Sequence, residues 1–374
     1  MSHSKAQALT LEAQIRYAEL PMPETGQVSQ VAPGLFWLRM PLPFALNHIN
    51  LWLLEDQFQG TQGWAVIDTG VANDATRAAW LQLINTHFKS LPITRVLCTH
   101  FHPDHVGLAA WLCRGAGGNR WKAPLWMNFA EYTAARLWNR QGAAPTNAED
   151  PDTANIADHF HKHGITDPET LDKLRARRDY YPSLVPEVPT SFRRIFPNET
   201  ISIGAHEWQI IAGYGHSPEH CALFCKPLNV LISGDMVLPK ISTNMSVWAQ
   251  EPEADPLKLY LDSLNAYEAL PDDVLVLPSH GKPFGAQTGG RDGGIKIRLA
   301  QLRDHHQDRL AETMAACETA KSAAEVLPVL FKRDLDLHQL TFALGETIAH
   351  LNYLWHSGRL KRVEDSHGRL RFTA

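Results

Sequence analysis

A run of ligand-type side chains at residues 99–105 constrains this chain more than any other feature. The run reads Thr-His-Phe-His-Pro-Asp-His, and it places His100, His102, Asp104 and His105 within six positions. Two histidines two positions apart point to the same side only where the backbone is extended or turning. Imidazole and carboxylate groups are also ligands that divalent zinc prefers. The run therefore predicts a loop that contributes to one or two metal sites.

Further ligand candidates follow short apolar runs downstream. They are His216 after residues 208–215, Asp235 after residues 230–234 and His280 after residues 274–279. Short apolar runs that end in glycine or another small residue are typical of buried strands, which present polar side chains at their carboxyl ends. We therefore expect these side chains to lie beside the histidine-rich loop. Any one of the histidines, taken alone, would be interpreted as an ordinary core or loop residue.

The order of these residues resembles the metallo-β-lactamase-fold hydrolases. The family pattern is HxHxDH, then a histidine after a glycine, an aspartate in a Gly-Asp pair and a histidine in a Ser-His-Gly group, and the chain carries all of them in order. The segment Val-Ile-Asp-Thr-Gly at residues 66–70 also looks like the family's, and its Asp68 would support the histidine loop from behind the ligands. The resemblance implies an α+β fold, a four-layer αββα sandwich with metal ions at one edge.

The resemblance also implies that two divalent ions share the ligands. One ion would take His100, His102 and His216, the second would take Asp104, His105 and His280, and Asp235 would bridge both. Such a pair supports hydrolysis by a hydroxide held between the ions, since bound water loses its proton near pH 7. Asp104 is the expected catalytic carboxylate, which would orient the hydroxide and help to move a proton. Zinc is the expected metal, with iron and manganese as alternatives because the same ligands suit them.

Two details of the motif narrow the expected activity. His102 stands where oxygen-reducing di-iron members carry glutamate, which argues against a redox role. Asp235 is present although true β-lactamases usually lack it, which argues against antibiotic hydrolysis. The chain therefore resembles the glyoxalase-II-like hydrolases of thioesters and their relatives that act on lactones, esters or phosphodiesters. Resemblance alone does not choose among these substrates.

The composition is consistent with a soluble enzyme. Apolar residues make up 44% of the 374 positions, the formal net charge is -5, and no stretch approaches the roughly eighteen apolar residues of a membrane span. Residues 1–30 contain no apolar run of signal-peptide length. The five cysteines show no framework spacing, so we expect reduced thiols and a cytoplasmic location. Cys221 and Cys225, four apart on an expected strand, are interpreted as core residues.

The catalytic domain is predicted to span residues 31–290, after a polar lead-in at 1–30 with a short helix near 11–17. The first strands are predicted at residues 34–39 and 48–55. His48 follows a loop that lies at the mouth of the metal site in the family, so it is a candidate for substrate contact. Lys240 and Asn244 are further candidates, since loops after strand ends commonly carry binding groups. Ordinary hydrogen bonding within the loops is the alternative role for all three.

The long segment between His105 and His216 predicts a helical insertion at about residues 129–195. Apolar residues recur at helical spacing over residues 129–140, and helical character returns at 156–163 and 168–181 after a loop. Long insertions are usually lids, binding loops or interfaces. Six side chains would form a wall for a bulky anionic substrate such as a CoA or glutathione conjugate, unless they only pack the insertion onto the core: Trp138, Arg177, Arg178, Tyr180, Tyr181 and Arg193. The histidines of residues 159–163 are expected on a solvated helix face.

Residues 291–374 are predicted to form a separate tail. A helix is predicted from residue 295 through 327 and another over 336–353, followed by a hairpin over 359–372 with a Gly-containing loop. This order resembles the winged-helix tail of a superfamily branch that includes thioesterase-like proteins and a mitochondrial endoribonuclease.

The tail leaves two functions open. It is a structural cap or homodimer surface beside a thioester or ester hydrolase, or the nucleic-acid module of an endoribonuclease or phosphodiesterase. Basic residues of the hairpin favour the second, since they could contact phosphates. Acids scattered through the tail argue against it, because nucleic-acid-binding domains show a stronger basic bias. We expect a small-molecule acyl thioester or ester substrate, no nucleic-acid partner and no membrane association.

Overall fold

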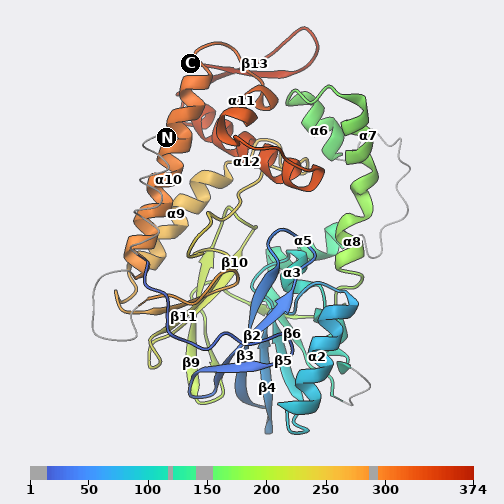
Figure 1. Ribbon diagram of the computed structural model, residues 1–374, viewed down its shortest axis with the longest axis vertical. Coiled ribbons are helices and arrows are strands. Elements are labelled where there is room, and N and C mark those ends of the chain that lie inside the picture. Colours follow the sequence, from blue (N-terminus) through green and yellow to red (C-terminus); the bar gives the residue numbers. More distant parts are fainter. Residues whose placement is uncertain (1–14, 117–120, 140–154, 286–293) are drawn as a thin grey trace.

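The computed structural model describes residues 15–116, 121–139, 155–285 and 294–374, and every structural statement below concerns these residues. Two β-sheets face each other in the lower part of Figure 1, and helices cover the outer side of each sheet. The helices of residues 156–176 from the predicted insertion and of residues 323–356 from the tail lie together at the top of the same view, with a terminal hairpin.

The larger sheet has seven strands in chain order within the described residues. They are β1 (Val28–Ala32), β2 (Leu35–Pro41), β3 (His48–Phe58), β4 (Thr61–Ile67), β5 (Ile93–Leu97), β6 (Leu125–Asn128) and β7 (Arg193–Ile195). Strands β1 to β4 are antiparallel, and β4 to β7 run parallel. The first strand therefore begins at Val28, inside the expected lead-in, because that segment pairs with β2. The helix expected near residues 11–17 lies mostly outside the described residues.

The smaller sheet has the order β12-β11-β10-β9-β8 in the described part of the chain. Its strands are β8 (Thr200–Ile203), β9 (His206–Gly213), β10 (His220–Cys225), β11 (Val230–Gly234) and β12 (Leu275–Pro278). Only β11 and β12 pair in parallel. The strands predicted before His216, Asp235 and His280 are therefore confirmed as β9, β11 and β12.

The buried side chains place the layers in the order helix, sheet, sheet, helix. Trp52 and Leu54 of β3 pack between the sheets with Trp208 of β9, whereas Leu51 and Leu53 face the helices on the other side of the larger sheet. This alternation follows from the two-residue repeat of a strand, and both faces are apolar because both are covered. The outer helices of the larger sheet are α2 (Asp74–Thr86), α3 (Pro103–Val106), α4 (Ala109–Cys113) and α5 (Phe129–Asn139). The predicted α+β class is confirmed.

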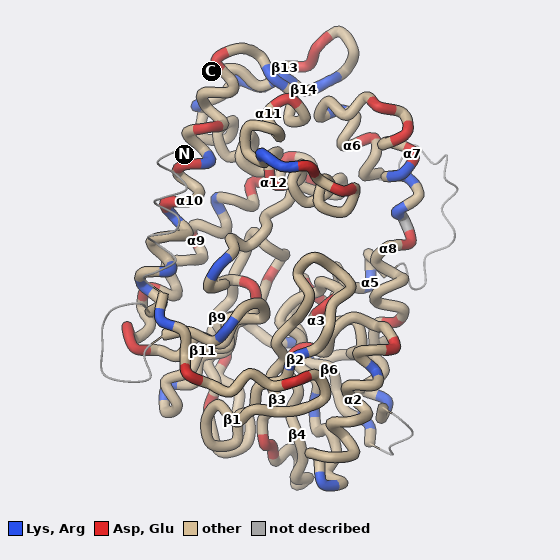
Figure 2. Tube along the Cα trace, viewed as in Figure 1, with Lys and Arg blue, Asp and Glu red and all other residues tan. Residues whose placement is uncertain are grey.

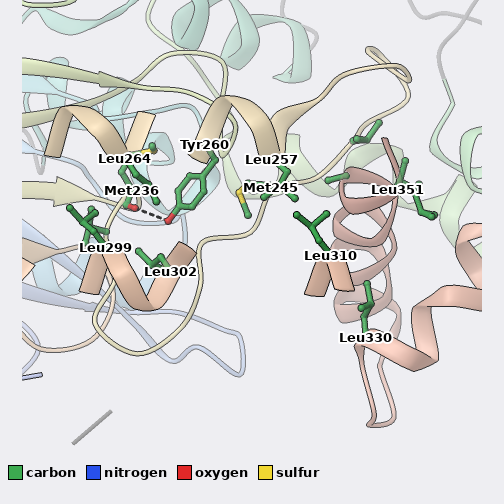
Figure 3. Packing of buried hydrophobic residues seen from close by; sticks show 14 of the residues in the cluster. Met236, Met245, Leu257, Tyr260, Leu264, Leu299, Leu302, Leu310, Leu330 and Leu351 are labelled. Atoms are coloured by element: carbon green, nitrogen blue, oxygen red, sulfur yellow. Dashed lines mark hydrogen bonds between the residues drawn. The ribbon is translucent and has the colours of Figure 1, made fainter. Parts of the chain in front are cut away.

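The smaller sheet is covered by α9 (Pro256–Glu268) and α10 (Ile295–Ala316). Figure 3 shows Tyr260 of α9 among leucines of α9 and α10, and its hydroxyl donates a hydrogen bond to the Met236 carbonyl at 3.0 Å. Met236 directly follows Asp235, so this packing fixes the backbone that presents the carboxylate. Cys221 and Cys225 are buried between the sheets, as expected for core residues.

The remaining helices belong to the insertion and the tail. They are α6 (Ile156–Lys162), α7 (Pro168–Ala176), the short 3-10 helix η2 (Arg177–Asp179), α8 (Tyr180–Leu184), α11 (Ala323–Leu330) and α12 (Leu337–His356). The strands β13 (Lys361–Glu364) and β14 (Leu370–Thr373) form the predicted hairpin. The single helix predicted over residues 295–327 is wrong. It breaks after α10, because Ser322 and Glu325 form a capping box that starts α11.

Candidate metal centre

The candidate ligands meet where several strands end. The loop after β5 carries His100 and His102, and Pro103 then begins α3, so that Asp104 and His105 lie in its first turn. β11 ends directly before Asp235, and β12 ends two residues before His280. Because carboxyl ends of neighbouring strands lie at one edge of a sandwich, side chains far apart in the sequence converge there.

One group of nitrogen atoms comes from the ligand loop and the segment after β9. His100 Nε2 lies 2.9 Å from His102 Nδ1 and 3.2 Å from His216 Nε2. A second group lies beside it, with His280 Nε2 at 3.3 Å and His105 Nε2 at 3.7 Å from Asp104 Oδ2. Each group could hold one cation.

Asp235 lies between the two groups. Its Oδ2 is 3.4 Å from His216 Nε2, and its Oδ1 is 3.6 Å from both His105 Nε2 and His280 Nε2. Ligands at about 2.1 Å from a zinc ion in tetrahedral geometry lie about 3.4 Å apart, close to these separations. One carboxylate thus presents a different oxygen to each group.

Atoms left without partners also fit a metal centre. His105 Nε2 and Asp235 Oδ1 are buried and make no hydrogen bond within the described structure. Burial alone would lower the pKa of His280, but the Asp235 and Asp104 carboxylates raise it to about 10. Burial would raise the pKa of Asp235, yet the His280 and His105 imidazoles hold it well below its usual value. Bound cations would neutralise the charge of these buried carboxylates. Without cations, protons on the neighbouring histidines must do so.

Asp68 supports the ligand loop from below. Its Oδ2 lies 2.8 Å from His105 Nδ1, and its Oδ1 accepts a hydrogen bond from the Thr99 backbone N–H at 2.7 Å. An Nδ1–H donated to Asp68 leaves His105 Nε2 free as a ligand. Asp68 itself has a φ of 63°, a strained value for a residue with a side chain, which is frequent at functional sites.

The three residues predicted to contact substrate, His48, Lys240 and Asn244, have different surroundings. His280 Nδ1 donates to the His48 carbonyl at 3.0 Å, and His216 Nδ1 donates to the Asn244 carbonyl at 2.8 Å. His48 and Asn244 thus orient candidate ligands through their backbones. Lys240 is exposed on the loop after Asp235. Contact of these three side chains with substrate stays a prediction.

Glu131 is a buried residue that the sequence did not reveal. Its Oε2 accepts the Phe101 N–H at 2.9 Å, while its Oε1 accepts the Ser217 hydroxyl and the Glu219 N–H, both at 2.6 Å. Phe101 lies between His100 and His102, and Ser217 follows His216. Glu131 therefore joins both loops of the first group of ligands. Burial raises its pKa to about 7, although the three hydrogen bonds oppose this. Its helical position, in α5, gave no signal.

His220 is a second residue that the sequence did not single out. Its Nε2 accepts a hydrogen bond from the Asp235 backbone N–H at 3.1 Å, so it fixes the backbone at this candidate ligand. A Cβ on Gly234 would lie 2.2 Å from that nitrogen, and Gly234 has a φ of 54°. Glycine is thus required in the Gly-Asp pair both for its conformation and for its lack of a side chain.

The residues predicted either for a substrate wall or for packing of the insertion lie in different surroundings. Tyr181 is buried, and its hydroxyl donates to the Phe101 carbonyl at 2.6 Å, so its role is to anchor α8 to the ligand loop. Arg193 lies on β7, pairs with Glu199 and stacks on Trp126, away from the metal centre. Tyr181 thus takes the alternative role, packing of the insertion onto the core, and Arg193 does not line the site. A substrate wall formed by Trp138, Arg177 and Tyr180 stays a prediction. The side chain of Arg178 lies outside the described structure.

The prediction of a solvated face is wrong for two of the three histidines at residues 159–163, whereas His161 is exposed as predicted. His159 and His163 expose only 6% and 1% of their surface, because α6 packs its inner side against the tail. The His163 ring lies parallel to Phe372 of β14, with the ring centroids 6.3 Å apart. The sequence prediction was wrong since the tail that covers this face comes from residues two hundred positions later.

Comparison with known proteins identifies a family for this chain. Residues 46–280 match the sequence family described as Metallo-beta-lactamase superfamily, and residues 310–374 match Metallo-beta-lactamase-like, C-terminal domain. The first match covers more than half of the chain. The chain therefore belongs to the metallo-β-lactamase superfamily and is a metallo-hydrolase of that superfamily.

Three relatives cover nearly the whole chain. A crystal structure of a beta-lactamase domain protein from Burkholderia ambifaria shares 50% identity at a TM-score of 0.88, over 97% of this chain and 99% of that chain. A metallo-beta-lactamase family protein from Thermus thermophilus shares 27% identity at a TM-score of 0.71, over 92% and 99%. A probable metallo-hydrolase, YqjP, from Bacillus subtilis (strain 168) is 23% identical over 332 residues, 85% of this chain and 91% of its own length. Among the described helices, none is both long and apolar enough to cross a membrane.

Proposed function

We propose that this protein hydrolyses a small-molecule thioester or ester with two divalent ions, as the glyoxalase-II-like hydrolases do. The observation that carries the proposal is Asp235, whose two carboxylate oxygens face different groups of nitrogen ligands at 3.4 Å and 3.6 Å. A bridging carboxylate is expected of a binuclear centre and would have no purpose in a mononuclear one.

The residues divide between the two ions as the distances suggest. The first ion would be held by His100, His102 and His216, the second by Asp104, His105 and His280, with Asp235 on both. The donor set of imidazole and carboxylate suits zinc, and iron or manganese as alternatives. When bound, such ions lower the pKa of water toward 7 and polarise a carbonyl group.

Asp104 is the residue that we assign to proton movement. Its side chain exposes 18% of its surface, more than that of Asp235 at 9%, so it faces the open side of the centre. Burial would raise the pKa of Asp104, but His105 and His280 lower it to about 2. It is thus ionised at neutral pH and can accept a hydrogen bond that aims an attacking water at the carbonyl carbon. The proton can then pass to the leaving thiolate or alkoxide.

The tail fits a structural role better than a nucleic-acid module. We propose that α10, α11, α12 and the hairpin form a winged-helix-like unit that caps the centre. Arg362 pairs with Glu253 and lies over the Trp355 ring, and both Arg369 and Arg371 pair with Asp365. Figure 2 shows basic and acidic segments close together on this hairpin. Three of the five basic side chains of this hairpin are thus paired within the protein, and Arg359 and Lys361 are exposed on it. This pairing supports the structural role over the phosphodiesterase alternative.

Steady-state hydrolysis by metal-analysed protein tests the proposal. The panel contains glutathione and CoA thioesters, an aryl ester, a lactone, a phosphodiester and single-stranded RNA. We expect turnover of a thioester or ester that a chelator removes and that added zinc restores. Cleavage of RNA or the phosphodiester alone would overturn the proposal. We also propose a cytoplasmic location, supported by five free, buried cysteines. A homodimer through the tail is a further proposal, which light scattering of the purified protein tests.

A further inference from the structure

A row of aromatic rings leads from the ligand loop to α12. Phe101 lies between two candidate ligands, and its ring centroid is 5.9 Å from that of Trp138 on α5. Trp138 meets Trp248 at 5.4 Å, and Trp248 meets Phe342 of α12 at 6.1 Å. Every ring beyond Phe101 is half-buried. Partly exposed aromatic rings beside a reaction centre suit contact with the apolar part of a substrate.

The row continues to His338, one helical turn before Phe342. Their ring centroids are 5.0 Å apart, and the other face of His338 stacks on Phe44 from the loop between β2 and β3, at 5.1 Å with an angle of 13°. His338 Nδ1 lies 3.2 Å from an Arg177 guanidinium nitrogen and 3.3 Å from the Tyr180 hydroxyl. Burial and the Arg177 charge lower the pKa of His338, so the ring is neutral and accepts these bonds.

Arg177 is a half-buried cation that makes no direct ion pair within the described part of the chain, although the charge of Asp336 acts on it from farther away. Its guanidinium carbon lies 4.4 Å from the centre of the Tyr180 ring. No ion pair between residues that the structure describes includes Arg177, although surface arginines nearby are paired, as Arg175 is with Asp172. A guanidinium carries five N–H donors, and the contacts to His338 and Tyr180 use only part of them. Removing a charge from water is costly unless a partner compensates it.

The surroundings of Arg177 are tied to the metal centre through α8. Tyr181 fixes this helix to the ligand loop by its bond to the Phe101 carbonyl at 2.6 Å. The same helix, which begins at Tyr180, packs against α3, whose first turn carries Asp104 and His105. Arg177, Tyr180 and His338 thus lie on the side of the second group of ligands.

We infer that Arg177, with Tyr180 and His338, forms a subsite for a carboxylate of the substrate. The aromatic row would hold the apolar segment between that carboxylate and the scissile carbonyl. A carboxylate matches the planar fork of arginine and would give Arg177 a direct ion pair, which Asp336 does not make with it. This inference deepens the proposed hydrolase function and rests on it, because the bound carboxylate belongs to a substrate only if the protein is such a hydrolase. The anion subsite itself can be tested separately.

The kinetic experiment compares matched thioesters. In one pair, the charged member has its carboxylate on the acyl side: the glutaryl thioester of an aryl thiol is compared with the neutral pentanoyl thioester of the same thiol. In the other pair, the charged member has its carboxylate on the thiol side: the butyryl thioester of 3-mercaptopropionate is compared with the neutral butyryl thioester of propanethiol. We expect the protein to prefer the charged member of at least one pair by roughly tenfold or more in kcat/KM, since hydrogen bonds to charged groups are the strong ones. Arg177→Gln should reduce that ratio to about one, mainly through KM.

Two control variants test whether the effect is specific to the Arg177 guanidinium. Arg177→Lys keeps the charge without the planar fork and should retain part of the preference. Arg175→Gln removes a neighbouring, exposed arginine and should retain all of it. A charged-to-neutral ratio that survives unchanged in Arg177→Gln, or the lack of any preference in a wild-type protein that hydrolyses thioesters, would overturn the subsite.

A binding experiment separates the subsite from the proposed reaction. Calorimetry with the metal-loaded protein uses 3-phenylpropionate, with 3-phenylpropanol as the neutral probe. We expect the dissociation constant of the carboxylate to rise roughly tenfold or more in Arg177→Gln and to stay constant in Arg175→Gln. An equal constant in the wild type and Arg177→Gln would show that the metal centre alone holds the carboxylate, which would overturn the subsite. A loss of affinity with no thioester or ester turnover would refute the hydrolase proposal and keep the anion site.

Discussion

Replacement of Glu131 by glutamine tests how the first group of ligands is held together. The Glu131 carboxylate is fully buried and accepts three hydrogen bonds, from Phe101, Ser217 and Glu219. A glutamine of the same shape has one oxygen, which can keep the two donors at Oε1. Its amide nitrogen then faces the Phe101 N–H, so one backbone donor loses its acceptor.

The expected effect follows from that single lost bond. A buried donor left without a partner costs about 1–3 kcal/mol. Because the Phe101 amide lies between His100 and His102, much of this cost should appear as displacement of these two imidazoles. An equal loss in metal binding would raise the dissociation constant of the first site about 5- to 150-fold. The second site, on the other side of Asp235, should change less.

Competition with a chromophoric zinc chelator measures both dissociation constants, and thermal unfolding of the metal-free protein measures stability. Asp56→Asn is a matched control, since Asp56 is a buried carboxylate that pairs with Arg95 at 2.7 Å toward the other end of β3 from His48. It should lower the unfolding temperature without changing metal binding. If Glu131→Gln leaves both constants within twofold of the wild type, the proposed role of Glu131 is refuted.

Three further predictions concern support of the site and stability. Asp68→Asn places an amide nitrogen against either the His105 Nδ1–H or the Thr99 backbone N–H, which then loses its acceptor. Zinc affinity at the His105 site should therefore fall about 10- to 100-fold in the same chelator titration. An unchanged affinity would contradict the role of Asp68. Gly234→Ala forces a Cβ to within 2.2 Å of a buried imidazole nitrogen at a φ of 54°, so it should lower the unfolding temperature and displace the bridging carboxylate. A variant with wild-type melting and two bound ions would refute that reasoning. Burial lowers the pKa values of His159 and His163 to about 4 and about 3, from 6.5 in the unfolded chain. The unfolded state therefore binds more protons below pH 6.5, and each histidine should cost about 2 kcal/mol of stability by about pH 5. Urea unfolding between about pH 7 and 5 should show a shallower loss in the double glutamine variant, and an unchanged slope would contradict this.

The parts of the fold that the sequence predicted are those with local signals. The strand before Asp235 was predicted at residues 230–234 and is observed as β11 over the same residues, because an apolar run and a Gly-Asp pair mark its end. The hairpin of residues 359–372 was recognised in the same way, from alternating strands around a glycine. The candidate ligands follow such strand ends, so the sequence also predicted that they would lie together.

The parts that were missed depend on contacts between distant segments. Glu131 reads as an ordinary polar residue of an amphipathic helix, and only the folded chain brings it to Ser217 and Phe101. His159 and His163 follow a pattern that suits a solvated face, but the fold buries both of them, with Phe372 of the tail against His163. Local periodicity cannot reveal a partner that arrives from elsewhere in the chain.

The metal content of the Asp235→Ala variant tests the central claim most directly. Native mass spectrometry of the zinc-loaded proteins counts the ions bound to each chain, and circular dichroism checks that the variant is folded. We predict two ions in the wild type, and one or none in folded Asp235→Ala, since the carboxylate that faces both groups of ligands is gone. Two tightly bound ions in both proteins, with equal hydrolytic activity, would contradict the bridging role of Asp235 and the binuclear mechanism built on it.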